Sequence, residues 1–233
     1  MSSMTPLILA HRGDSAHAPE NTLDAFRLAL GAGAAGVEFD IHQARDGTFV
    51  VHHDADTPAG PIAELNLADL RGRPAKRGGT IPMLQDALAL LAAGGAAFTV
   101  FVEVKGMRSW PDLRRQLAPW RGRLDLEVQS FAHDLLAAMA RDREGWPLGV
   151  IAREPGPDPA ALLARFGART LSLRKEAVTA DVAAAVHAAG ARLAVWTLND
   201  AGAARAAAAA GADLLIGDDP RLLLSTFNPG KRT

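Results

Sequence analysis

Two short apolar runs of the sequence each carry a pair of charged residues separated by a single apolar residue. In "GVEFDI" the pair is Glu38 and Asp40. In "TVFVEVKG" it is Glu103 and Lys105. Because side chains two apart in a β-strand point to the same face, each run would place its charged pair on one side and its apolar residues on the other. The pattern predicts two strands whose outer faces pack on helices and whose inner faces bring three carboxylates and an ammonium together.

Three carboxylates in a small, poorly solvated space repel one another unless a proton or a cation intervenes. Even with Lys105 and Arg12 beside them, roughly one negative charge stays uncompensated. An all-oxygen ligand set suits a hard cation, so we expect Glu38, Asp40 and Glu103 to bind one Mg²⁺, Ca²⁺ or Mn²⁺. A salt-bridge network at the strand ends is equally supported by Glu38 and Asp40 alone, and Glu103 favours the metal.

Two histidines are expected beside these carboxylates. His11 ends the run "LILAH" and shares the parity of its two odd-numbered leucines, which would turn its ring toward the same interior. In "HQARDGTFVVHHD", the Asp-Gly pair at 46–47 indicates a two-residue hairpin loop. Counting back from that loop pairs Asp40 with His53 and places His52 on the opposite face. A loop with an odd number of residues would reverse the count.

The two histidines and two of the cations suggest phosphodiester cleavage. Imidazole titrates near neutrality, so His11 and His53 could act as a general acid and a general base. Arg12 and Lys105 could bind a phosphate that the metal polarises. A barrel that binds a phosphorylated ligand without turning it over is the alternative, although such a protein would not need an acid/base pair. His17, His42, His133 and His187 are expected to be structural.

Short β-rich runs alternate with amphipathic segments along the whole chain. The predicted strands are residues 7–10, 36–41, 99–104, 126–129, 148–151, 170–173, 192–196 and 213–216. The predicted helices are residues 22–30, 83–92, 111–120, 132–141, 159–166, 180–189, 200–210 and 220–226. This alternation predicts a TIM (β/α)8 barrel, whose active site forms where the strands end. An open doubly wound sheet is less favoured, because the first turn, "AHRGDSAHAPENT", is not a glycine-rich phosphate loop.

Length and composition fit a single domain over residues 1–233. A Pro/Gly-rich excursion at residues 53–82 should cover one end of the barrel. The net charge of −1 gives no indication of a nucleic-acid surface, and the absence of cysteine excludes thiolate chemistry. No apolar run approaches the ~20 residues of a membrane helix, and the N-terminal segment lacks signal-peptide features. We therefore expect no membrane span and a cytoplasmic location; the oligomeric state is not indicated.

Several separated motifs resemble the glycerophosphodiester phosphodiesterases, in order and across almost the whole chain: "AHRGDSAHAPENTLDAF", "GVEFDIHQARDGTFVVHHD", "IPMLQDAL", "FVEVKG", "QSF", "AVWTLN" and "GADLLIGDDP". The resemblance implies a TIM barrel related to phosphoinositide-type phospholipases C, a divalent cation, and hydrolysis of small-molecule glycerophosphodiesters to glycerol 3-phosphate and an alcohol. Matched motif by motif, it implies catalysis by His11 and His53, metal binding by Glu38, Asp40 and Glu103, and substrate binding by Arg12, Lys105, Trp196, Glu20 and Asn21.

The resemblance leaves several alternatives open. Trp196 could belong to the core, and Asn21 could cap the following helix. The excursion at residues 53–82 is shorter than the insertion that many family members carry. The part of the pocket wall that would hold the alcohol group of the substrate is therefore reduced. The family's "TD" near the last strand is replaced by Gly217-Asp218, which leaves a barrel-closing contact in question. The substrate could instead be a lysophospholipid or another phosphodiester, and attack by water or by the glycerol hydroxyl, through a cyclic phosphate, fits the sequence equally well.

Overall fold

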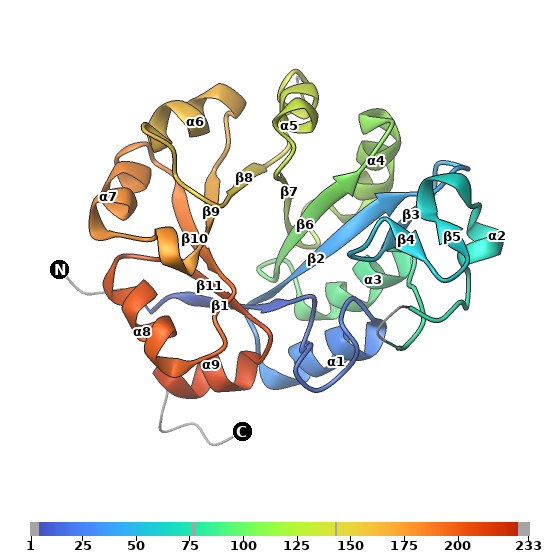
Figure 1. The fold of residues 1–233 in the computed structure, drawn as a ribbon, viewed down its shortest axis with the longest axis horizontal. Helices are drawn as coiled ribbons and strands as arrows, with labels where there is room; N and C mark the ends of the chain where they lie inside the picture. Colours follow the sequence, from blue (N-terminus) through green and yellow to red (C-terminus); the bar gives the residue numbers. More distant parts are fainter. Residues whose placement is uncertain (1–4, 76–77, 143, 228–233) are drawn as a thin grey trace.

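The computed structural model of the protein describes residues 5–75, 78–142 and 144–227, and the rest of the predicted single domain lies outside these residues. Eight parallel strands form a closed barrel in the described part, because β1 pairs with both β2 and β11 (Figure 1). The predicted TIM barrel is confirmed, and its strand ends differ from the prediction by at most two residues. The strands are β1 (Leu7–His11), β2 (Gly36–Gln43), β6 (Thr99–Gly106), β7 (Asp125–Ser130), β8 (Leu148–Ala152), β9 (Thr170–Arg174), β10 (Arg192–Trp196) and β11 (Leu214–Gly217).

Helices surround the barrel and connect its strands (Figure 1). The α-helices are α1 (Leu23–Ala32), α3 (Leu84–Leu91), α4 (Trp110–Leu117), α5 (His133–Ala140), α6 (Pro159–Phe166), α7 (Ala180–Ala188), α8 (Ala201–Ala209) and α9 (Pro220–Phe227). Short 3-10 helices are Ile62–Glu64, Ala92–Gly94, Ala118–Trp120 and Lys175–Ala177. Several helices begin where a side chain accepts a hydrogen bond from the amide three residues later, as at Thr22, Ser109, Asp158, Thr179 and Asp200. None of the described helices is long and apolar enough to cross a membrane.

The strand alternation divides the core into an outer and an inner layer. On the outside, Val37 and Phe39 of β2 pack with helix residues such as Phe26 and Leu88. On the inside, a smaller apolar cluster fills the barrel with Leu9, Phe101, Ala194, Leu214 and Ile216. The predicted orientation of β1, β2 and β6 is therefore confirmed. The apolar side chains of β2 pack outward, and Leu9 of β1 and Phe101 of β6 fill the barrel below the polar ends of their strands.

The strand β3 (Phe49–Val51) folds back on β2 as predicted, but the predicted register was wrong. Ile41 pairs with Val51, so the loop between the strands holds three residues, 45–47, instead of two. The amide of Gly47 donates to the carbonyl of Ala44, and Gly47 has a φ of 88°. This is the three-residue hairpin that ends in a left-handed glycine. Its odd length reverses the parity count that paired Asp40 with His53.

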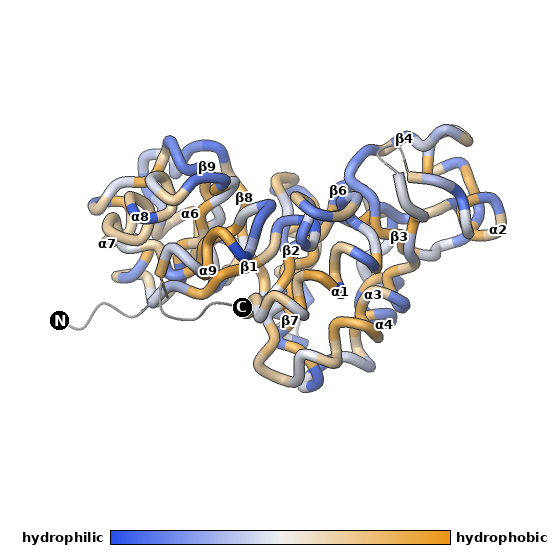
Figure 2. Tube along the Cα trace, turned by 90° about the horizontal axis from the view of Figure 1, so that it is seen from below, coloured by the Kyte–Doolittle hydropathy of each residue, from blue (hydrophilic) through white to orange (hydrophobic). Residues whose placement is uncertain are grey.

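The excursion predicted at residues 53–82 is short but folded. It contains the antiparallel pair β4 (Asp56–Thr57) and β5 (Gly60–Pro61), followed by α2 (Leu67–Leu70). Ile62 and Leu70 form a small separate core with Val50 of β3 and with Ala44, Ala75 and Ile81. The excursion lies beside β3 at one side of the barrel in Figure 1, and much of it is hydrophilic in Figure 2.

A cluster of buried polar residues lies inside the barrel near the N-terminal ends of β7, β9 and β10. Glu127 is fully buried and accepts hydrogen bonds from Arg169 Nε at 2.6 Å and Arg192 Nη2 at 3.1 Å. Gln129 Nε2 donates to Glu127 Oε1 at 2.7 Å, and Ser172 Oγ donates to Gln129 Oε1 at 2.8 Å. These hydrogen bonds connect the N-terminal end of the barrel, which we call the closed end, with Gln129 and Ser172 at the bottom of the pocket described next.

Candidate active site

A pocket of about 220 Å³ opens at the C-terminal ends of the barrel strands, and every barrel strand or its following loop contributes to the wall. The predicted site residues that lie on this wall are His11, Arg12, Glu38, His53, Glu103, Lys105 and Trp196. The structure thus brings together residues from motifs that are far apart in the sequence, at the place where a TIM barrel carries its chemistry.

The three predicted metal ligands lie side by side on β2 and β6. The parallel register pairs Asp40 with Glu103, and Glu38 lies on the same face of β2 as Asp40. All three side chains are buried, and a carboxylate oxygen from each lies within 4.8 Å of the others. We call these three residues the carboxylate cluster.

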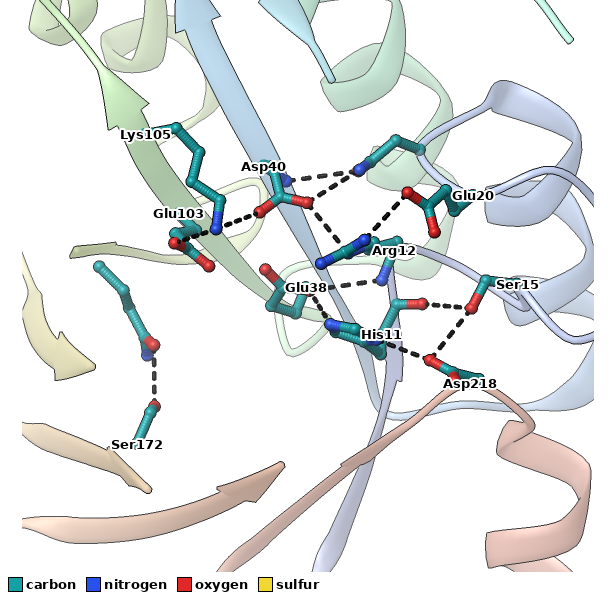
Figure 3. A network of polar contacts seen from close by, with 12 residues as sticks. His11, Arg12, Ser15, Glu20, Glu38, Asp40, Glu103, Lys105, Ser172 and Asp218 are labelled. Atoms are coloured by element: carbon teal, nitrogen blue, oxygen red, sulfur yellow. Dashed lines mark hydrogen bonds and ion pairs between the residues drawn. The ribbon is translucent and has the colours of Figure 1, made fainter. Parts of the chain in front are cut away.

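Two cations lie against the carboxylate cluster (Figure 3). Lys105 Nζ is 2.7 Å from Glu103 Oε1 and 3.3 Å from Asp40 Oδ1. Arg12 Nε is 3.2 Å from Asp40 Oδ2. Both cations therefore contact Asp40. Among the described residues, Glu38 receives the Arg12 backbone amide at 3.3 Å and has His11 Nε2 at 3.8 Å, without a lysine or arginine side chain paired to it.

Burial and charge shift the pKa values of the carboxylate cluster in different directions. Burial, together with the negative charges of Asp40 and Glu103, raises the pKa of Glu38 well above its usual range. Burial and the Asp40 charge also raise the pKa of Glu103 to about 7. Burial acts on Asp40 as well, but Arg12 and Lys105 outweigh it and lower its pKa. Without a bound cation, part of the cluster is therefore protonated near neutral pH.

Two oxygen atoms of the carboxylate cluster have no hydrogen-bond partner among the described residues. Asp40 Oδ1 and Glu103 Oε1 are buried, and Lys105 approaches both as an ion pair without hydrogen-bond geometry. Each of these oxygens has lost its hydration, and the ammonium of Lys105 offsets that loss without completing a hydrogen bond. Hard divalent cations bind oxygen ligands of this kind, so the residues present fit one such cation.

His11 is held by a residue that the sequence analysis did not assign to the site. His11 Nδ1 lies 2.6 Å from Asp218 Oδ1, directly after β11. Asp218 also accepts hydrogen bonds from Ser15 Oγ and Asn199 Nδ2. Burial opposes the charged form, but the contact with His11 outweighs it and lowers the pKa of Asp218. The departure from the family's "TD" is Gly217, whereas Asp218 keeps the aspartate and makes a barrel-closing contact with His11. A carboxylate at the end of a strand that neighbours β1 was the available signal.

His53 reaches the pocket by a different route from the predicted one. In the observed register His52 stands opposite Asp40, and its amide donates to the Asp40 carbonyl at 3.0 Å. The chain then leaves the sheet, which places His53 on the pocket wall. His53 Nδ1 lies 2.9 Å from Asp54 Oδ1, and its carbonyl lies 3.1 Å from His42 Nε2.

Glu20 and Asn21 lie behind the pocket wall. Asn21 Nδ2 donates to Asp40 Oδ2 at 2.9 Å, and Asn21 Oδ1 accepts from the Asp40 amide at 3.3 Å. Glu20 Oε1 accepts from Arg12 Nη1 at 2.9 Å. The cap of α1 is Thr22, so Asn21 is free of that role. In this geometry both residues position site residues, and their contact with substrate stays a prediction.

Trp196 lies on the pocket wall beside an aromatic residue to which no role was assigned. Its ring meets Phe131 edge to face, with the ring centroids 5.7 Å apart. Lys105 Nζ lies 5.7 Å from the Phe131 centroid, and Phe131 is 39% exposed, although it is large and apolar. The motif "QSF" contains Phe131. The two rings give the pocket an apolar side opposite the carboxylate cluster.

Comparisons with known proteins agree with this fold and pocket. Residues 11–222 match the glycerophosphoryl diester phosphodiesterase family. A glycerophosphodiester phosphodiesterase of Caldanaerobacter subterraneus is 27% identical and covers 97% of this chain and 100% of its own length. The crystal structure of a glycerophosphodiester phosphodiesterase from Thermotoga maritima has a TM-score of 0.78 at 26% identity, over 95% of this chain and 98% of that chain.

An Oleispira antarctica phosphodiesterase in complex with the product sn-glycerol-3-phosphate shares the fold, with a TM-score of 0.88 at 24% identity, over 96% of this chain and 97% of that chain. The match over residues 11–222 and the whole-length relatives confirm the family and the enzyme class that the motifs predicted. The chain belongs to the glycerophosphoryl diester phosphodiesterase family.

Proposed function

We propose that the protein hydrolyses glycerophosphodiesters to glycerol 3-phosphate and an alcohol, using one divalent cation and two histidines. The main support is the convergence of His11, His53, Arg12 and Lys105 with the carboxylate cluster around one pocket. The printed names of the relatives and the product bound to the Oleispira antarctica enzyme support the substrate class.

The carboxylate cluster would hold Mg²⁺, Ca²⁺ or Mn²⁺, and such a cation supplies Lewis-acid polarisation of a phosphoryl oxygen when bound. Arg12 and Lys105 lie on the same pocket wall and carry N–H donors suited to the other phosphoryl oxygens. Because both side chains also contact Asp40, their position is set before a substrate enters.

The carboxylate contacts of the two histidines support their proposed role as a proton-transfer pair. Each binds a carboxylate through Nδ1, His11 to Asp218 and His53 to Asp54, which leaves Nε2 of each ring for the substrate. In the proposed reaction one ring takes the proton of the attacking oxygen as the new P–O bond forms. The other ring donates a proton to the alcohol oxygen as its bond to phosphorus breaks. The two aspartates stabilise the charged form of each ring.

The test is release of glycerol 3-phosphate from glycerophosphocholine, glycerophosphoethanolamine and glycerophosphoglycerol, with lysophospholipids in parallel. We expect release that a chelator stops and added Mg²⁺, Ca²⁺ or Mn²⁺ restores. His11→Ala and His53→Ala should each lower kcat by about 10²–10⁴. His187→Ala is the matched control, because His187 pairs with Asp213 ahead of β11, away from the pocket. Ligand binding without turnover, unchanged by either substitution in the pocket, would instead identify a binding protein.

A further inference from the structure

The active-site pocket continues into a second hollow beside β8, β9 and β10. This outer hollow has a volume of about 280 Å³ and is lined by Arg153, Arg174, Lys175, Glu176, Trp196 and Thr197. Arg153, Trp196 and Thr197 also line the active-site pocket, so the two spaces are continuous. The strand order places the outer hollow across the barrel from the carboxylate cluster on β2 and β6.

Arg153 is a cation on the wall that the active-site pocket and the outer hollow share. It directly follows β8, its side chain is exposed, and within the described residues it makes no hydrogen bond or ion pair. The other arginine and lysine side chains on the wall of the active-site pocket, Arg12 and Lys105, both contact the carboxylate cluster. The guanidinium of Arg153 is therefore available to an anion that enters with the substrate.

The charge of the outer hollow favours an anion. Arg174 donates to Glu154, which compensates one of the three cations on the lining. The remaining charged residues of the lining are the cations Arg153 and Lys175 and one carboxylate, Glu176, which leaves a net positive charge. A quaternary or primary ammonium would meet two positive charges here, whereas a phosphate or carboxylate would gain charge-assisted hydrogen bonds.

The shape of the active-site pocket directs the alcohol half of a diester toward the outer hollow. At its inner end, the pocket is lined by the buried polar side chains of Gln129 and Ser172, which suit the hydroxyl groups of glycerol. The path away from that end passes Arg153 and Trp196. We propose that the outer hollow binds an anionic group on the alcohol, so that the enzyme prefers glycerophosphodiesters whose alcohol carries a phosphate or carboxylate. This inference rests on the proposed function.

Two diesters that differ by one phosphate test the inference: glycerophosphoinositol and glycerophosphoinositol 4-phosphate. With the metal-loaded enzyme, we expect kcat/KM to be about tenfold higher for the phosphorylated diester at low salt and the preference to weaken as salt is added. Arg153→Gln should reduce this ratio by about threefold or more, and Arg153→Gln with Lys175→Gln should bring it close to one. The matched control is Arg205→Gln, an exposed arginine on α8 outside both cavities, which should keep the wild-type ratio.

The outcomes separate the two proposals. Equal kcat/KM for the two diesters, or a ratio that Arg153→Gln leaves unchanged in a variant with the wild-type Tm, would overturn the inference while hydrolysis itself stands. No hydrolysis of either diester by the metal-loaded wild type would overturn the proposed function, and the preference with it.

Discussion

The two histidines of the pocket are anchored in different ways. His11 is 19% exposed and binds Asp218, which is itself fixed by two further side chains. His53 is 35% exposed and binds its sequence neighbour Asp54, which is 37% exposed. Because water competes more strongly for exposed hydrogen bonds, the Asp218 contact should orient its ring more firmly than the Asp54 contact does.

Replacing Asp218 therefore tests how His11 is positioned. Asp218→Asn should lower kcat about tenfold or more with little change in KM, because an amide neither enforces the same tautomer nor stabilises a charged ring. Asp54→Asn should have a smaller effect on kcat. Steady-state kinetics of both variants on the same diester measures the difference. Equal losses, or a loss confined to KM, would contradict this role of Asp218.

The pKa values of the carboxylate cluster predict how cation binding depends on pH. The pKa of Glu103 is about 7 and that of Glu38 is raised well above its usual range, so a cation must displace protons below neutral pH. The association constant for Mn²⁺ should then fall by up to about tenfold per pH unit for each proton displaced. Calorimetric titration between pH 5.5 and 8 measures this slope.

Glu103→Gln is the control for this pH dependence. It removes one titrating carboxyl group of the proposed cation site, so Mn²⁺ should bind more weakly and with a shallower slope. An affinity that does not change with pH in the wild type would show that the cluster is already fully ionised.

At the level of strands and helices, local periodicity explains what the sequence could predict. The two-residue period of β2 and β6 decides which side chains face the barrel, so the carboxylate cluster could be predicted from "GVEFDI" and "FVEVKG" alone. The β2–β3 register could not. "ARDGT" is compatible with a two-residue loop and with a three-residue loop. The observed loop is held by the excursion, since the Arg45 amide donates to the Leu65 carbonyl and Asp46 accepts from the Leu67 amide.

The contact between His11 and Asp218 could not be predicted for a related reason. It joins residues at opposite ends of the chain and exists because β11 pairs with β1. A barrel prediction implies that pairing, but nothing in the local pattern says which residue after β11 faces His11. Long-range partners of this kind depend on the closed sheet as a whole.

Gly149 on β8 leaves the space that the side chains of Glu127 and Gln129 occupy inside the barrel. This close packing gives a prediction about stability. A Cβ at Gly149 would come within 2.3 Å of Glu127 Oε1 and 2.8 Å of Gln129 Nε2. Gly149→Ala should therefore lower the free energy of unfolding by about 1–3 kcal/mol. Gly31→Ala is the matched control on α1, where a Cβ meets nothing within 4 Å, and it should raise that free energy by about 0.5–1 kcal/mol. Urea unfolding measures both, and equal effects of the two substitutions would contradict the packing argument.

For the molecule as a whole, the barrel contains two buried clusters of charged residues, and the two clusters differ in how completely cations balance their carboxylates. Glu127 is surrounded by Arg169 and Arg192 at the closed end. The carboxylate cluster, at the C-terminal ends of the strands, has three acids and two contacting cations, Arg12 and Lys105, within the part of the chain that the structure describes. The stability of the barrel should therefore depend on what is bound at its open end.

The sign of this dependence follows from the raised pKa values. A glutamate whose pKa is higher in the folded protein stabilises the fold below its usual value of 4.5 and loses that contribution as the pH rises. For Glu103 the loss extends to about pH 7, and for Glu38 it continues above the usual range of a glutamate. The cation-free protein should thus lose stability between about pH 4.5 and 7, and a divalent cation should restore it by binding the folded form.

Glu38→Gln separates a metal site from a salt-bridge network. At pH 7.5 with chelator, the variant should melt at or slightly above the Tm of the wild type, because glutamine cannot take the negative charge that burial, Asp40 and Glu103 oppose at this position. Added Mg²⁺ should raise the Tm of the wild type but not that of the variant, while exposed Glu64→Gln should behave like the wild type. A network would give the opposite result, since losing the Glu38 carboxylate removes negative charge that balances Arg12 and Lys105 and lowers the Tm of the variant. A chelated Glu38→Gln protein that melts below the wild type would therefore identify the cluster as structural.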